Sequence, residues 1–131
     1  MILLDTHALV WFFSQDPQLS PKARKHIEKA KAESSIFVSA ISVWEISMLV
    51  EKGKLVLKID VSKWLEIVSK STYIQFVPVD ADIARQSVTL PGFSNPDPAD
   101  RIIIATAQSL QVPIITKDKK MHQYSGISCI W

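Results

Sequence analysis

Short apolar segments alternate with longer amphipathic ones along this chain, and this alternation constrains the fold more than any other feature. Strands are expected at residues 1–4, 36–38, 73–79, 112–116 and 127–130. Helices are expected between them, at residues 8–14, 21–33, 40–52, 61–71, 81–90 and 99–110. Strands that alternate with helices favour a mostly parallel sheet covered on both faces. The pattern therefore predicts an α/β fold.

Residues with strong end preferences mark several of these boundaries. Ser20 and Asp80 stand directly before expected helices, where their side chains suit the N-cap position. Gly53 suits the end of the helix that contains Glu45. Residues 91–98, PGFSNPDP, form the clearest loop because they include three prolines and a glycine.

The length and composition fit one globular domain. A chain of 131 residues suits a single domain spanning residues 1–131. Hydrophobic residues make up 47% and charged residues 21%, which excludes a disordered chain. The net charge of +2 and the pI near 8.7 permit nucleic-acid binding but do not demand it.

The cysteine content and the N-terminus favour a cytoplasmic protein. Cys129 is the only cysteine, so no internal disulfide can form, which suits a reducing compartment. Asp5 and His7 interrupt any apolar signal region at the N-terminus. No uninterrupted apolar stretch approaches the ~18 residues of a membrane span. We therefore expect no association with a membrane.

Two acidic residues follow expected strands. Asp5 comes directly after the first strand, and Asp118 follows the fourth. Right-handed crossovers align the ends of parallel strands, and ligands bind beyond their carboxyl ends. Each acid also has a simpler interpretation, because Asp5 suits a helix cap and Asp118 suits a turn. Together they indicate a site at one edge of the sheet.

Glu45 lies on an apolar stripe of its expected helix. Ile41 and Leu49 are four residues away from it, and Met48 is three residues away. An ionised carboxylate is normally excluded from such a stripe unless it is paired. The simpler alternative is an edge residue whose carboxylate reaches outward to solvent.

Asp100 has a local explanation as well as a functional one. In the segment NPDPADR, Asp97 suits the N-cap and Asp100 the third helical position, where the helix dipole favours an acid. Ile103 and Ile104 follow three and four residues later, so Asp100 can also face inward. We interpret Asp97 as a cap first and as a site residue second.

A cluster of these four acids makes physical sense mainly around a divalent cation, because carboxylates repel one another and resist desolvation. An all-oxygen site selects Mg²⁺ or Mn²⁺, and no histidine or cysteine spacing suits zinc. Cations of this kind activate water and clamp phosphoryl groups, so the pattern predicts phosphodiester hydrolysis. Thr116 offers a hydroxyl that could hold a water on the metal, although threonine is also common in strands.

Four segments together carry a family resemblance. They are DTH at 5–7, VWEI at 43–46, DPADRIIIATA at 97–107 and IITKD at 114–118. With these segments the chain resembles the PIN-domain family, specifically the VapC type of toxin ribonuclease from toxin–antitoxin pairs. The resemblance implies a Rossmann-like α/β/α sandwich with a five-stranded parallel sheet. It also implies endoribonuclease activity dependent on Mg²⁺ or Mn²⁺, a homodimer, and inhibition by a cognate antitoxin protein.

The resemblance also assigns roles to residues. The four metal-cluster acids of the family correspond to Asp5, Glu45, Asp100 and Asp118, and its recurrent hydroxyl residue corresponds to Thr116. As a mechanism hypothesis, the three aspartates ligate the metal, while Glu45 completes the cluster and orients the attacking water. Many relatives have histidine before the D-P-x-D-R stretch, whereas this chain has Asn95 and Pro96.

Basic residues around the acids are candidates for contact with RNA. A contact of this kind would be salt-dependent, and single-stranded loops are the expected target. For Arg101 an ion pair with a site acid is the simpler alternative. The candidates are Arg101, Lys117, Lys119 and Lys120.

Three rival functions fit an acid-rich parallel sheet. A receiver-like signalling domain needs two acids after the first strand and a phosphoacceptor after the central one, whereas this chain offers Asp5 and, after the third strand, Asp80. A phosphatase of the haloacid dehalogenase type needs an aspartate at position 7, where His7 stands. A catalytically silent binding module need not keep four acids.

Overall fold

The computed structural model describes the whole chain, Met1–Trp131, and contains one five-stranded parallel sheet. The strand order is β3-β2-β1-β4-β5, with every neighbouring pair parallel. The α/β fold and the parallel sheet expected from the sequence are therefore confirmed. The strands are β1 (Ile2–Leu4), β2 (Ile36–Ser39), β3 (Ile74–Val77), β4 (Ile114–Ile115) and β5 (Cys129–Ile130).

Seven helices connect the strands. All six expected helices are present, and all of their ends agree with the expected ones within two residues. The seventh helix was not expected: it follows β4 and has five residues, too few for a helical periodicity to be visible in the sequence. The helices are α1 (Thr6–Ser14), α2 (Pro21–Ala32), α3 (Ala40–Glu51), α4 (Val61–Lys70), α5 (Ala81–Val88), α6 (Pro98–Leu110) and α7 (Lys119–Gln123).

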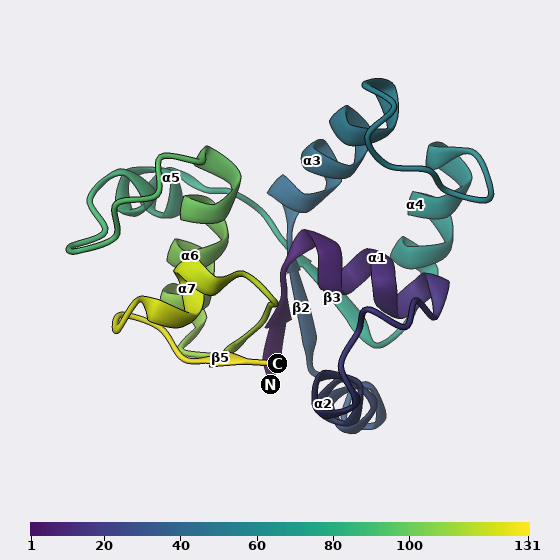
Figure 1. Ribbon diagram of the computed structural model, residues 1–131, viewed down its shortest axis with the longest axis horizontal. Helices are drawn as coiled ribbons and strands as arrows, with labels where there is room; N and C mark the ends of the chain where they lie inside the picture. Colours follow the sequence, from purple (N-terminus) through teal and green to yellow (C-terminus); the bar gives the residue numbers. More distant parts are fainter.

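Helices cover both faces of the sheet, as Figure 1 shows. α1, α2 and α4 lie on one side of the strands, and α5, α6 and α7 lie on the other. The two sides correspond to two buried apolar clusters. Ile2 and Leu4 point into the first cluster, whereas Leu3 between them points into the second, as the period of two in a strand requires. None of the helices combines the length and the apolar character needed to cross a membrane.

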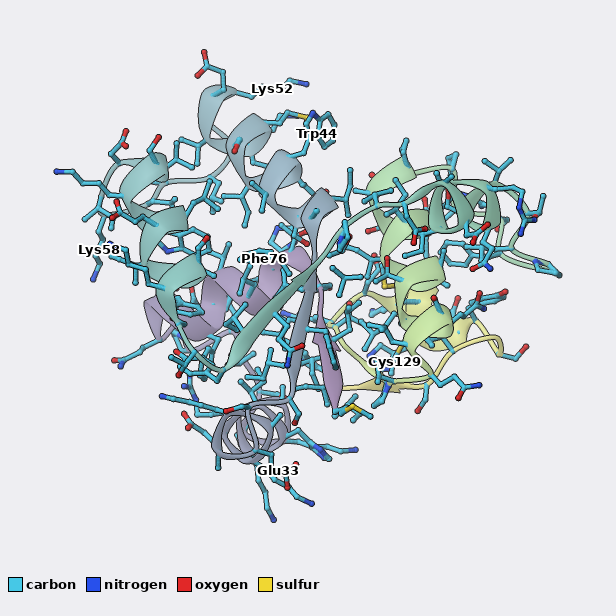
Figure 2. All side chains as sticks on the ribbon, turned by 180° about the vertical axis from the view of Figure 1, so that it is seen from behind. Glu33, Trp44, Lys52, Lys58, Phe76 and Cys129 are labelled. Carbon is cyan, nitrogen blue, oxygen red and sulfur yellow. The ribbon has the colours of Figure 1, made fainter.

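The tryptophans divide between core and surface. Trp64 of α4 is buried in the first cluster, and Trp11 and Trp131 pack against that cluster. Trp44 is 56% exposed and projects outward from α3 (Figure 2). Among them, Trp44 alone is left largely uncovered.

The strand order places a topological switch point between β1 and β4. From β1 the chain moves to β2 and β3 in one direction, and β4 and β5 then extend the sheet in the other. Leu4 pairs with Ile115, so the residues that follow these two strands emerge side by side. Ligands of open α/β sheets bind at such a point.

Replacing Ile104 by alanine tests the second apolar cluster. Ile104 lies on α6 and is completely buried, so its truncation leaves a cavity under the helix. We expect a loss of about 2–5 kcal/mol in the free energy of unfolding, measured by urea denaturation. The exposed Val88→Ala serves as the control and should change stability by less than about 0.5 kcal/mol. Equal stability of the two variants would contradict this packing.

Candidate active site

A cleft of about 430 Å³ lies beyond the carboxyl ends of β1 and β4. It contains the four acids expected from the sequence and adds Asp97 to them. Residues that are far apart in the chain therefore meet at the switch point. The cleft is lined by Asp5, Thr6, His7, Trp11, Glu45, Asp97, Asp100, Ile103, Lys117 and Asp118.

Asp5 is both a helix cap and a buried site residue. Its Oδ1 accepts the N–H of Ala8 at 2.8 Å, which caps α1, and its Oδ2 accepts the hydroxyl of Thr116 at 2.5 Å. Only 8% of Asp5 is exposed. Burial raises the pKa of its carboxyl above the usual value, while the bonds from Thr116 and Ala8 oppose that rise. The cap and site interpretations are therefore compatible.

Thr116 links the two central strand ends. Its hydroxyl donates to Asp5 and accepts the N–H of Asp118 at 3.0 Å. The side chain is fully buried. The hydroxyl has a second acceptor lone pair, so the predicted water-holding role of Thr116 stays a prediction. What the structure shows is that Thr116 connects the side chain of Asp5 to the backbone of Asp118.

Asp118 starts the short helix α7. Its Oδ1 accepts the N–H groups of Lys120 at 2.7 Å and Met121 at 3.1 Å. The simpler interpretation of Asp118 as a turn residue is wrong in detail, because the residues that follow form a helix that it caps. No protein donor bonds to its Oδ2, which leaves that oxygen available to a ligand.

Asp100 lies in the first turn of α6, directly after the cap. The side chain of Asp97 accepts the N–H of Asp100 at 3.0 Å, which confirms the cap expected at Asp97. The Oδ2 atom of Asp100 accepts the amide of Asn95 at 2.9 Å. Burial, followed by the charges of Asp97 and Asp118, raises the pKa of Asp100 to about 7.

Glu45 is the acid with the fewest protein partners. It is partly buried on α3, lines the cleft, and forms no hydrogen bond with another side chain. Its negative charge contributes to the raised pKa values of Asp5 and Asp100. The carboxylate therefore faces the other acids across the cleft and is not directed away into solvent.

The acids of the cleft have no cationic partner within the protein. The single salt bridge of the structure joins Lys70 to Glu66, far from the site in the chain. No three acidic, histidine or cysteine side chains converge tightly enough to enclose an ion. Mg²⁺ does not need a cage made only of protein ligands, because it keeps several waters and is usually held by one or two carboxylates in addition to substrate phosphates. The oxygen donors and the uncompensated charge fit such a cation.

The candidate RNA-binding residues separate into two groups. Lys117 lines the cleft with its Nζ 5.8 Å from the centre of the Trp11 ring. Lys119 and Lys120 are exposed beside it on α7. Arg101 instead donates four hydrogen bonds to backbone carbonyls of residues 87–95. The ion pair considered for Arg101 is absent, and only one of its five N–H groups remains for RNA.

Several residues of the site carry no functional signal in the sequence. His7 and Trp11 line the cleft on α1, where their spacing of four residues places them on one helical face. The buried hydroxyl of Thr6 donates to that of Ser42 at 3.0 Å and joins α1 to α3. Asn95 carried no local signal, because its partners are fixed by the fold of the loop.

The chain matches known proteins over nearly its whole length. A family model described as the PIN domain matches residues 2–127. The chain belongs to the PIN-domain family. It is 32% identical over 132 residues to Ribonuclease VapC22 of Mycobacterium tuberculosis, an alignment that covers 99% of this PIN domain and 98% of the relative. The resemblance to the VapC type is thereby confirmed.

Solved structures share the fold of this PIN domain. VapBC2 from Rickettsia felis, bound to a promoter DNA fragment, matches with a TM-score of 0.73 and 17% identity, covering 98% of this chain and 97% of that one. A toxin–antitoxin complex from Klebsiella pneumoniae matches with a TM-score of 0.61 and 22% identity, covering 96% of this chain and 94% of that one.

The receiver-like and phosphatase alternatives lose their support. Asp80 follows β3, which is an edge strand of the sheet, and it caps α5 outside the cleft. The central strand of this sheet is β1, so Asp80 does not stand where a receiver domain would need its phosphoacceptor. Together with the match to the PIN-domain family, this leaves no feature that favours a receiver domain or a phosphatase.

Replacing Asp100 by asparagine should stabilise the metal-free protein at neutral and higher pH. Because the pKa of Asp100 is raised in the folded state, wild-type stability falls as the pH rises from about 4 to about 7. The variant should be more stable at pH 8 by roughly 1–2 kcal/mol, discounted for solvent screening, and the difference should vanish near pH 4. Urea denaturation at both pH values in the presence of EDTA measures this, with the exposed Asp82→Asn as control. Equal stability of the variant and the wild type at pH 8 would contradict a raised pKa at Asp100.

Proposed function

We propose that this PIN domain is a metal-dependent endoribonuclease that hydrolyses phosphodiester bonds in RNA. The observation that carries the proposal is the cleft at the switch point, where acids gather without any cation from the protein. Support comes from the relative named Ribonuclease VapC22, which is 32% identical over nearly the whole chain. A silent binding module would have no need for this costly arrangement of acids.

Mg²⁺ or Mn²⁺ is the proposed cofactor, held directly or through water by Asp5, Glu45, Asp100 and Asp118. Oδ2 of Asp118 and the carboxylate of Glu45 have no protein donor, so they are available as ligands or as acceptors for ligated water. When bound, a divalent cation lowers the pKa of water and offsets the negative charge of a phosphate.

The residues of the chain supply orientation and affinity. Thr116 and the N-terminus of α1 fix Asp5, and the N-terminus of α7 fixes Asp118. The unpaired carboxylate of Glu45 is placed to accept a proton from the attacking water. Lys117, Lys119 and Lys120 provide positive charge for the phosphates of a single strand.

Replacing Asp5 by asparagine tests the proposed activity. Asparagine caps a helix as well as aspartate does, so the fold should persist while a charged ligand is lost. Cleavage of single-stranded RNA in Mg²⁺ should fall by on the order of 100-fold or more, and EDTA should abolish the wild-type activity. Asp60→Asn, which alters the exposed cap of α4 in the same way, should cut normally.

Titration with Mn²⁺ separates the cation from the substrate. Glu45→Gln should weaken Mn²⁺ binding by roughly tenfold in calorimetry, whereas the exposed Glu51→Gln on the same helix should not. Two outcomes would remove the proposal: wild-type protein that cuts no RNA in Mg²⁺, or equal cutting by wild type and Asp5→Asn.

We further propose that an antitoxin protein occupies a second groove, of about 770 Å³, between α1, residues 54–59 and α4. The groove shares His7 and Trp11 with the acidic cleft, so an occupant would also hinder RNA. It is lined by exposed apolar side chains, and a contiguous apolar surface of this kind is typical of an interaction site. The exposed fractions are 88% for Val56, 53% for Ile67 and 43% for Ile59. The homodimer stays a prediction that rests on the family resemblance alone.

Replacing Val56 by aspartate tests this groove. A charge in an apolar contact should weaken binding of the cognate antitoxin by on the order of tenfold or more in calorimetry. RNA cleavage by the free variant should not change. The matched control is Val88→Asp, because Val88 is 73% exposed on α5 and lies outside the groove. If both variants bind the antitoxin like the wild type, the groove is not the docking site.

A further inference from the structure

The loop between α5 and α6 contains a buried asparagine next to the acidic cleft. Asn95 is only 8% exposed, although Ser94 and Pro96 on either side of it are exposed. A buried amide is costly unless both of its ends are hydrogen-bonded. Its Nδ2 donates to Oδ2 of Asp100 at 2.9 Å, and its Oδ1 accepts the N–H of Asp97 at 3.1 Å. Both ends are therefore bonded to acidic residues of the cleft.

These bonds fix Asp100 from two directions. The side chain of Asp97 holds the backbone N–H of Asp100 at 3.0 Å, and Asn95 holds one carboxylate oxygen. No protein donor bonds to the other carboxylate oxygen, Oδ1. A neutral amide achieves this without adding charge, whereas another acid at position 95 would repel Asp100.

Arg101 in turn holds the loop that carries Asn95. Its Nη1 donates to the carbonyls of Asn95 and Phe93, both at 2.9 Å. Its Nε donates to the carbonyl of Ser87 at 2.7 Å, and its Nη2 donates to that of Val88 at 3.1 Å. The guanidinium also lies 5.7 Å from the centre of the Phe93 ring. Lysine cannot reproduce this planar fork of donors.

From this geometry we propose that Asn95 is a positioning residue that turns the free carboxylate oxygen of Asp100 toward the cation, and that Arg101 holds Asn95 in place. The inference rests on the proposed metal-dependent function and deepens it. Arg101 then acts on the cation site through Asn95, although its side chain does not line the cleft.

The proposal predicts a specific loss of cation affinity. Residues that orient a metal ligand typically contribute 10- to 100-fold to affinity, so Asn95→Ala should raise the Kd for Mn²⁺ by roughly tenfold or more. Ser94→Ala, in the same loop but exposed, should bind like the wild type. Arg101→Lys should also raise the Kd for Mn²⁺, because lysine cannot replace the guanidinium hydrogen bonds that hold the loop.

A double-mutant cycle distinguishes positioning from a merely structural role. If Asn95 acts through Asp100, then Asn95→Ala should change Mn²⁺ affinity by about twofold or less when Asp100→Asn is already present. Calorimetry with Mn²⁺ alone measures all four proteins, and thermal unfolding confirms that each is folded.

The outcomes separate this proposal from the proposed function. Wild type that binds no Mn²⁺ would overturn both. Wild-type binding with unchanged affinity in Asn95→Ala, or an equal loss in both backgrounds, would overturn the role of Asn95 alone. Normal Mn²⁺ affinity in Arg101→Lys, combined with a raised KM for RNA, would show that Arg101 binds substrate and does not hold the loop.

Discussion

Helix N-termini hold four of the five acids of the cleft at the edge of the sheet, and Glu45 in the middle of α3 is the exception. Asp5 caps α1, Asp97 caps α6 and Asp118 caps α7, and these helices begin at or near the cleft. The free N–H groups and the dipole of a helix N-terminus favour negative charge, so each cap partly offsets the repulsion from its neighbours. Without these caps, the carboxylates of the cleft would be harder still to ionise in the folded protein.

The helix N-termini offset only part of the negative charge in the cleft, and the remaining charge suits a cation. Burial still raises the pKa values of Asp5 and Asp100, the latter to about 7, and no lysine or arginine pairs with any acid of the cleft. The metal-free fold therefore stores unfavourable charge that a divalent cation would relieve. Stability given up at a functional site in this way is common in enzymes. The two apolar clusters on either face of the sheet supply the stability that tolerates it.

The cleft also depends on segments that do not line it. Thr116 ties Asp5 to Asp118, and Thr6 ties α1 to α3 through Ser42. On the other side, Arg101 holds the carbonyls of the loop before α6, and Asn95 connects that loop to Asp100. The site is therefore supported from both halves of the sheet. The apolar groove beside it shares His7 and Trp11, so any occupant of the groove would lie next to the acids.

Local sequence determined the elements, and the tertiary structure decided the contacts. Periodicity and caps revealed the parallel α/β fold, the cap at Asp80 and the placement of Asp5 and Asp118 at strand ends, because these signals act over a few residues. The apolar stripe around Glu45 also indicated its inward position. The order of the strands, the helix α7 and the partners of Arg101 and Asn95 were not readable in this way. They depend on which segments pack together across the sheet. The hydrogen-bond partners of a buried amide or guanidinium are set by that packing and not by the neighbouring residues in the sequence.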